Sequence, residues 1–392
     1  SIRRRQRQMC IRDSNKGQTK ERMLQQPGFF DQGTLVSVMT LAPLDSALDY
    51  RAPEGGCHMG AYVEVPLGPR KVLGVVWGAG RGDYDLSKIR AVARVLNVAP
   101  MRAELQSFLE RGADYTLTPR PAMLRLATRV PGLSNPPSMR KVYRPGATEP
   151  DRMTDARRRV LETFQSYGGL AFTLKELADM AGVSQSVIKG MVALGAVQEE
   201  DTPRDLPFQT LETAHSQTIL TAAQNSAANA LIAGLKEQTY GTTLLKGVTG
   251  SGKTEVYLEA VAECLQQGRQ ALVLLPEIAL TAEFLNRVEA RFGALPAEWH
   301  SGVTLTERRR VWKMVGSGGA QMVIGARSAL FLPYQNLGLI VVDEEHDSSY
   351  KQEDGVLYNA RDMAVLRASI CGAHVVLASA TPSLESWANA EA

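Results

Sequence analysis

The spacing of hydrophobic positions changes along the chain and predicts regions of different architecture. From Gly33, short β-branched runs separated by proline and glycine predict a small barrel or sandwich, followed by one helix; they read GTLVSVMTLAP, GAYVEVPLG and RKVLGVVWGAG, and then MRAELQSFLERGADYTL. From about Leu220 to the end, strands and helices alternate, which is typical of an α/β fold with a mainly parallel sheet. We therefore expect a multidomain α/β protein with a small β-rich N-terminal domain.

Residues 151–205 contain two helical patterns around a tight turn at Gly182. The apolar residues at helical spacing are Leu174, Leu177, Ala178 and Ala181 before the turn and Val183, Val187, Ile188 and Met191 after it. This spacing is typical of a winged-helix domain, and Ser184 is suited to cap the second helix. Such a domain contacts DNA in many proteins and serves for packing in others. Because Lys189 is the only basic residue from Ser184 to Met191, the sequence leaves both roles open.

These patterns divide the chain into segments. We expect a β-rich domain at 33–130, a linker rich in proline, glycine and serine at 131–150, the winged-helix domain at 151–205 and an α/β lobe at 206–392. Residues 1–32 are basic and polar without an apolar period, and we interpret them as a disordered or non-native tail. The alternatives are a nucleic-acid-binding arm and an arginine-rich transit peptide.

Composition narrows the class of protein without deciding its function. The 392 residues carry a net charge of +3, which permits nucleic-acid binding without arguing for it. No apolar run is long enough to span a membrane and no secretory signal is seen, so we expect a cytoplasmic protein without a membrane partner. The four cysteines, Cys10, Cys57, Cys264 and Cys371, are scattered without a C-x-x-C pair, and suggest neither a zinc site nor a disulfide framework.

The stretch LLKGVTGSGKTEVYLEA, from Leu244 to Ala260, runs from an apolar strand through a glycine loop into an amphipathic helix. It matches the P-loop pattern, in which backbone N–H groups and a helix N-terminus cradle phosphates. The expected nucleotide-binding residues are Gly247, Thr249, Gly250, Ser251, Gly252, Lys253 and Thr254. Lys253 would reach the β- and γ-phosphates and Thr254 would ligate Mg²⁺, so ATP and Mg²⁺ are the expected cofactors.

The stretch LGLIVVDEEHDSSY supplies the carboxylates that nucleotide hydrolysis needs. Leu339 to Val342 predict a buried parallel strand, which places Asp343 and Glu344 at its C-terminal end, where ligands of α/β proteins bind. We expect Asp343 to hold Mg²⁺ and Glu344 to act as the base for the attacking water. His346 is a further catalytic candidate that could orient these groups, as could Glu345.

An acidic D-E-x-H segment after a P-loop is the signature of helicase superfamily 2, and the companion stretches of that signature are present in order along the chain. They are VLLPEIALT, GARSALF and ASATPSLES. Thr281, Arg327 and Ser328 lie in loops after strands and are suited to contact the phosphates of a DNA strand. Ser379 and Thr381 could relay the state of the γ-phosphate. Upstream, ILTAAQNSAANAL resembles an adenine-reading motif with Gln224 as the reader.

From Gly33 to the C-terminus, these motifs resemble bacterial primosomal protein N′, the PriA family of replication-restart helicases, most specifically in DEEHDSSYKQ. The resemblance implies an ATP-dependent 3′-to-5′ DNA helicase that recognises stalled or branched forks and starts primosome reassembly in the nucleoid. It implies replication forks, free 3′ ends and single strands as DNA partners, together with primosome proteins and single-stranded-DNA-binding protein. It also implies that Tyr350, Lys351, Tyr358 and Arg361 link DNA to hydrolysis; packing of these side chains against a lobe is the alternative.

In the β-rich domain, the same resemblance points to a pocket for the 3′ end of a DNA strand. Asp49 would accept a hydrogen bond from the terminal 3′-hydroxyl, and Gly68 would let the last base approach the backbone. Tyr50 and, more weakly, Arg90 complete the expected set, with ordinary turn and strand roles as the alternative. Leu48 stands where an aromatic residue often precedes the aspartate, which puts base stacking at this point in doubt.

The chain ends at Ala392, shortly after the stretch ASATPSLES. The second RecA-like lobe that the family implies, and the zinc module within it, would lie beyond, so we expect this chain to bind no zinc. Because arginines of a second lobe would stabilise the transition state, we expect a truncated form with ATP and DNA binding but little turnover. The alternatives are a non-catalytic module that binds branched DNA and another superfamily 2 translocase, acting on RNA or in restriction.

Overall fold

The structure, a computed structural model, describes residues 28–44, 46–130, 132–133, 139–150, 152–216, 219–276 and 281–391. Residues 1–27 of the expected tail, with Cys10, lie outside the described residues. The described chain falls into two compact units, one built from the stretches up to 133 and from 207 onward, and the other from residues 139–206. Each unit is described by itself.

The first unit begins with a curled antiparallel sheet of order β3-β2-β6-β5-β7. Its strands are β2 (Leu35–Thr40), β3 (Leu48–Arg51), β5 (Tyr62–Leu67), β6 (Arg70–Ala79) and β7 (Arg94–Val95). Alternate valines of β2 and β5, including Val36 and Val63, fill the interior. Arg51 of the edge strand β3 pairs with Ala91, just before the other edge strand, so the sheet closes on itself. A short pair, β1 (Phe29–Phe30) with β4 (Cys57–His58), and the helices α1 (Ala103–Thr116) and α2 (Arg120–Thr128) complete this part.

The rest of the unit is built on a six-stranded parallel sheet of order β10-β17-β14-β11-β13-β12. The strands are β10 (Gly241–Lys246), β11 (Gln270–Leu274), β12 (Ala297–Trp299), β13 (Met322–Gly325), β14 (Leu337–Asp343) and β17 (His374–Ser379). The helices are α6 (Ala222–Lys236), α7 (Lys253–Gln266), α8 (Ala282–Phe292), α9 (Leu305–Gly316), α10 (Ala360–Cys371) and α11 (Leu384–Glu391). Short 3₁₀ turns η2 (Arg327–Phe331) and η3 (Ser348–Tyr350) and the pair β15 (Lys351–Gln352) and β16 (Tyr358–Asn359) complete it.

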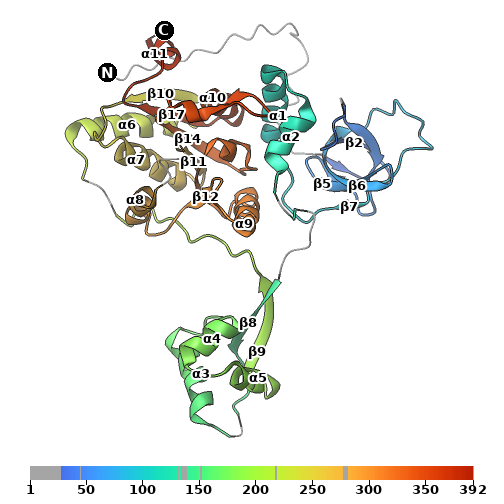
Figure 1. Cartoon of the computed structure of the whole chain (residues 1–392), viewed down its shortest axis with the longest axis vertical. Coiled ribbons are helices and arrows are strands. Elements are labelled where there is room, and N and C mark those ends of the chain that lie inside the picture. The colour runs from blue at the N-terminus through green and yellow to red at the C-terminus, as the bar shows by residue number, and fades with distance from the viewer. Residues whose placement is uncertain are drawn as a thin grey trace. The chain divides into compact units, whose positions relative to one another are not determined.

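Two hydrophobic cores cover the two faces of this parallel sheet. Successive residues of β14 alternate between them, Ile340 belonging to one core and Val341 to the other. Helices α6, α7 and α8 cover one face, and α9 and α10 cover the other, where α1 and α2 of the N-terminal part join them (Figure 1). The expected mixed α/β fold, with a β-rich N-terminal part and a parallel sheet, is confirmed.

The second unit contains three helices and one antiparallel strand pair. Its elements are β8 (Met139–Pro145), α3 (Asp155–Ser166), α4 (Leu174–Ala181), α5 (Gln185–Ala193) and β9 (Val197–Pro203). Thr173 and Glu176 form a capping box at α4, and Gly182 ends it in the left-handed conformation with φ of 60°. Ser184 occupies the N-cap position of α5 as expected, but its hydroxyl bonds Ser186 rather than a helix N–H.

A buried tryptophan joins the two halves of the first unit. The indole N–H of Trp312, on α9, donates to the carbonyl of Ala127 at 2.9 Å, and its ring meets Tyr62 edge to face at 5.2 Å between centroids. The Trp312 side chain is fully buried among residues of both halves. The β-rich part and the parallel-sheet part therefore share one core.

Replacing Trp312 by alanine should lower the free energy of unfolding by about 3–5 kcal/mol, because it leaves a large cavity and an unpaired carbonyl. Trp387→Ala is the matched control, since that indole is 38% exposed, and its cost should stay below about 1 kcal/mol. Urea unfolding curves of both variants measure the difference. Equal losses would contradict the shared core.

Candidate nucleotide and DNA sites

Three segments leave the parallel sheet side by side at its carboxyl edge. β17 lies between β10 and β14, with Ser379 opposite Lys246 and Ala378 opposite Asp343. Beyond the strands, Gly247 N–H donates to Ser379 O at 3.2 Å, and the N–H of the residue two after Asp343 donates to Ala378 O at 3.1 Å. The sheet order therefore brings the P-loop, the acidic segment and the ASATP segment together.

The P-loop glycines take backbone conformations, or lie close to neighbouring side chains, in ways that disfavour a larger residue. Gly250 and Gly252 have φ values of 77° and 79°, in the left-handed region. A Cβ atom on Gly252 would lie 2.3 Å from Gln224 Nε2, and one on Gly247 would lie 2.5 Å from Ser251 Oγ. Thr249 lies between Gly247 and Gly250 in the loop, and α7 begins directly after Gly252. The loop thus presents backbone N–H groups at the start of a helix, as phosphate binding requires.

Lys253 is buried inside this loop. Its ammonium donates to the carbonyl oxygens of Gly247 and Val248 at 2.9 and 3.4 Å and lies 3.7 Å from Glu344 Oε1. The cation of the P-loop and the carboxylate of the expected base therefore form an ion pair beside the P-loop.

The Asp343 carboxylate is held by two donors. The hydroxyl of Tyr257, on α7, donates to Oδ2 at 2.9 Å, and Glu344 N–H donates to Oδ1 at 3.0 Å. Burial raises the pKa of Asp343, and the Tyr257 hydrogen bond and nearby Lys253 oppose that shift. Thr254 lies one helical turn before Tyr257 on the same side of α7. A hydroxyl and a carboxylate suit Mg²⁺, which takes most of its other ligands from phosphates and water. Among the described residues, no cluster of three or more metal-binding side chains occurs.

The expected catalytic group His346 connects two motifs. Its Nδ1 lies 2.8 Å from the hydroxyl of Ser379 and 3.7 Å from Glu344 Oε2. The Ser379 hydroxyl also accepts from Thr381 N–H at 3.1 Å. Glu344 itself adopts φ of 46°, uncommon for a residue with a side chain, at the point where the chain turns sharply after β14.

Glu345, a possible orienting group by its sequence position, lies at the centre of a buried network. Its carboxylate accepts from Ser383 N–H at 2.7 Å and from the Ser386 hydroxyl at 2.9 Å, and Arg361 Nη1 lies within 3.4 Å. This network ties the acidic segment to the start of α11. Ser383 and Ser386 were missed, because only the fold brings them to an acidic residue about forty positions earlier.

Gln224, on α6, contacts the P-loop with its side chain. Its side chain completes a capping box with Thr221, while Nε2 donates to Ser251 O at 2.9 Å. The T-x-x-Q spacing was a readable signal for this cap. The predicted adenine contact of Gln224 stays a prediction.

The residues expected to contact a DNA strand occupy different environments. Thr281 caps α8, and the Ser328 hydroxyl accepts from the Trp299 indole at 3.1 Å. Arg327 donates to the carbonyls of Ser349 and Lys351 at 2.9 and 2.5 Å, which fastens η2 to the loop after β14. In the structure, these three side chains therefore form hydrogen bonds with other groups of the same chain.

The two tyrosines of the loop after β14 are buried. The Tyr350 hydroxyl donates to Asp343 O at 2.6 Å and Leu274 O at 3.0 Å, and the Tyr358 ring meets Phe331 edge to face at 5.3 Å. Lys351 is exposed. The placement matches the packing alternative for both rings, and their predicted DNA role is untested.

Of the four residues expected at the DNA 3′ end, Tyr50, Gly68 and Arg90 meet at the turn between β5 and β6, and the Asp49 carboxylate bonds Gly82. Arg90 Nη1 donates to Gly68 O at 3.0 Å, and the Tyr50 hydroxyl donates to Pro66 O at 3.1 Å. Burial raises the pKa of Tyr50, which Arg90 partly offsets. Asp49 Oδ2 accepts from Gly82 N–H at 2.7 Å. Gly68, with φ of 60°, has no heavy atom within 4 Å of where a Cβ would stand, so this turn is open to an incoming group.

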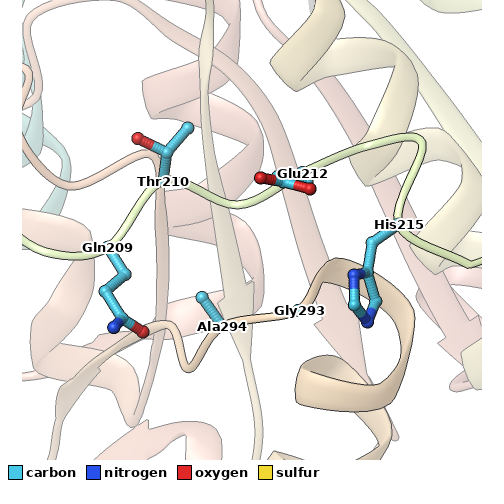
Figure 2. A pocket seen from close by; sticks show the side chains of 6 residues that line it. All are labelled: Gln209, Thr210, Glu212, His215, Gly293 and Ala294. Atoms are coloured by element: carbon cyan, nitrogen blue, oxygen red, sulfur yellow. The ribbon is translucent and has the colours of Figure 1, made fainter. Parts of the chain in front are cut away.

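A separate pocket of about 450 Å³ lies at the opposite, amino edge of the parallel sheet (Figure 2). It is lined by Gln209, Thr210, Glu212, His215, Gly293 and Ala294, and the last two precede β12. Because the nucleotide motifs follow the carboxyl ends of the strands, this pocket is distinct from the P-loop site.

Comparisons with known proteins agree with this geometry. Residues 221–389 match the DEAD/DEAH box helicase model, and residues 37–129 match the 3′ DNA-binding domain model of PriA. Replication restart protein PriA of Bacillus subtilis is 30% identical, covering 89% of this chain and 53% of the relative. The PriA of Haemophilus influenzae is 34% identical, covering 91% and 50%. The chain belongs to the PriA family.

The chain spans about half the length of these curated PriA relatives. Among solved structures, RecG bound to a three-way DNA junction is similar at 22% identity and a TM-score of 0.34, covering 47% of this chain and 25% of RecG. In the described part of the chain, no helix is both long and apolar enough to cross a membrane.

We predict that Asp343→Asn stabilises the nucleotide-free protein at pH 7 by on the order of 1 kcal/mol, because it removes a buried charge. Since the folded pKa of Asp343 is raised, its cost is full above that pKa and disappears as pH falls toward the unfolded value of 3.8. Urea unfolding at a series of pH values measures this.

Asp354→Asn, at an exposed carboxylate, is the control and should change little. A loss of stability in Asp343→Asn at neutral pH, or a gain that persists unchanged at pH 4, would count against this electrostatic account.

Proposed function

We propose that this chain supplies the ATP-binding and DNA-binding parts of an ATP-dependent DNA helicase that recognises branched or stalled replication forks, translocates 3′ to 5′ and begins primosome reassembly. The observation that carries the proposal is the approach of Lys253 to Glu344, 3.7 Å apart, beside Asp343 at the carboxyl edge of the sheet. The same compact unit contains the match to a 3′ DNA-binding domain. The nucleotide site and the DNA 3′-end site would then belong to the same compact unit.

The residues present fit ATP with Mg²⁺. The loop from Gly247 to Gly252 offers backbone N–H groups, and the Lys253 ammonium, which bonds two loop carbonyls and faces the Glu344 charge, has a third N–H that can donate to a phosphate oxygen. Thr254 and Asp343 would hold the metal, whose charge offsets that of the phosphates. The Glu344 carboxylate would take the proton of the attacking water. The hydrogen bond between His346 and the Ser379 hydroxyl would couple the position of the γ-phosphate to the ASATP segment.

The DNA-binding part of the proposal rests on residues of the closed β-sheet in the N-terminal part of the unit. Asp49 would accept the hydrogen bond of a terminal 3′-hydroxyl with the carboxylate oxygen that Gly82 leaves free. Arg90 supplies a cation beside the open Gly68 turn, which suits a backbone phosphate. Strand contacts by Thr281, Arg327, Ser328, Lys351 and Arg361, with the two loop tyrosines, belong to the same proposal.

We further propose that residues 151–205 form a winged-helix domain that contacts DNA. Three helices lie between the two strands of an antiparallel pair, β8 and β9, and this arrangement supports the assignment, with β8 in the segment before residue 151. The proposed boundaries remain 33–130 for the 3′-end domain and 206–392 for the helicase lobe. Primosome proteins and single-stranded-DNA-binding protein are the proposed protein partners, and the bacterial nucleoid in the cytoplasm is the proposed location, both from the family relationship.

A second candidate function is a DNA-structure-binding module that works without hydrolysis. The independent placement of the Asp49 pocket and the P-loop, on different elements of the unit, favours testing the two activities apart. A third possibility, another superfamily 2 translocase, would show no preference for branched DNA with a free 3′ end.

Two variants should separate the activities. Lys253→Ala should weaken binding of a fluorescent ATP analogue more than about tenfold while leaving the preference for a fork with a 3′-hydroxyl over a 3′-phosphate intact. Asp49→Ala should do the reverse, since it removes the proposed acceptor of the hydroxyl. Fluorescence anisotropy of labelled forks and of the nucleotide measures both.

ATP binding that survives Lys253→Ala would overturn the nucleotide site. An unmodified protein that binds both fork ends equally would overturn the 3′-end function. End preference that needs no nucleotide, together with no fork-stimulated hydrolysis in a full-length relative carrying the same P-loop, would favour the non-catalytic module.

A further inference from the structure

The loop of residues 80–90 is fastened beside the candidate 3′-end pocket at three points. Gly82 N–H donates to Asp49 Oδ2 at 2.7 Å, Arg51 Nη2 donates to Leu86 O at 3.0 Å, and Arg51 N–H donates to Arg90 O at 2.9 Å. An internal turn, in which Asp85 accepts from Ser87 N–H and hydroxyl at 3.0 and 2.7 Å, stiffens the loop. The loop therefore holds a set position against β3.

The middle of this loop carries an aromatic side chain that the fold does not use. Tyr84 is 63% exposed, and no hydrogen bond, ion pair or ring contact holds it among the described residues. It stands two residues from Gly82 and two from Leu86, so its Cα lies within about 7 Å of both fastened positions. Leu86 is also 51% exposed. An exposed ring on a fastened loop loses little conformational freedom when it packs against a ligand.

In the described part of strand β3, neither Tyr50 nor the residue before Asp49 offers a ring to a base. Tyr50 is only 4% exposed, with its hydroxyl committed to Pro66 O, and the residue before Asp49 is the aliphatic Leu48. A nucleotide whose 3′-hydroxyl reached Asp49 would have its base free to lie against the neighbouring loop. Aromatic side chains bind bases through stacking, which is independent of base identity.

We infer that Tyr84 is a base-stacking residue of the 3′-end pocket and contacts the terminal base of the bound strand. This inference rests on the proposed 3′-end function and adds a second contact to it. Asp49 reads the hydroxyl, and Tyr84 holds the base without selecting its identity. Stacking of this kind predicts similar affinity for all four terminal bases.

The test uses the full chain and a forked DNA whose 3′-terminal base is 2-aminopurine, a fluorescent adenine analogue that stacking quenches. Binding should quench the terminal probe, Tyr84→Ala should abolish the quenching and weaken binding roughly tenfold, and Tyr84→Phe should keep both. Tyr115→Ala is the matched control, since that tyrosine is 59% exposed on α1, and it should change neither.

Quenching that persists in Tyr84→Ala, or that is lost equally in Tyr115→Ala, would overturn the inference. Quenching seen only with the probe at the penultimate base would also overturn it. A fork ending in a 3′-phosphate distinguishes failure of the proposed 3′-end function from failure of the Tyr84 inference. If the unmodified protein binds it as well as the 3′-hydroxyl fork, the 3′-end function fails. If end preference stays and only the Tyr84 effect is missing, this inference alone fails.

Discussion

The candidate nucleotide site depends on the order of strands in the parallel sheet. β17 separates β10 from β14, so the P-loop and the acidic segment each lie beside the ASATP segment, and backbone bonds from Gly247 N–H to Ser379 O and from Glu345 N–H to Ala378 O tie the three together. Parallel strands end at one edge, so loops distant in sequence meet there. A sheet that placed β10 and β14 at opposite ends would separate Lys253 from Glu344.

Neighbouring carboxylates of the acidic segment have different surroundings and hence different tasks. Glu345 is buried, paired with Arg361 and bonded by two serines, and removing one partner of such a group is costly. It anchors the segment. Asp343 and Glu344 are half-buried beside Lys253 and remain available to ligands. Fixing one carboxylate leaves the other two in a set orientation, which would position a metal and a water, as proposed, without rearrangement.

Much of the fold and the P-loop could be predicted because their signals are local. The strand, glycine loop and helix around Lys253 follow from spacing alone, and the apolar run before Asp343 predicts the buried β14. Features that depend on contacts between distant parts of the sequence could not be predicted. For Tyr350 and Tyr358 the sequence left DNA contact and packing open, and the structure shows both side chains packed against β14 and η2, while their DNA role stays a prediction. The Glu345 contacts with Ser383 and Ser386 needed the sheet order, which no local pattern encodes.

The central claim is that one nucleotide is held by three segments at the carboxyl edge of the sheet. Hydrogen–deuterium exchange with and without Mg²⁺ and a non-hydrolysable ATP analogue tests it most directly. The account predicts slower exchange in residues 247–254, 343–346 and 379–383 together, with no change around His215 and Gly293. Slower exchange around that second pocket, with the three segments unchanged, would contradict it.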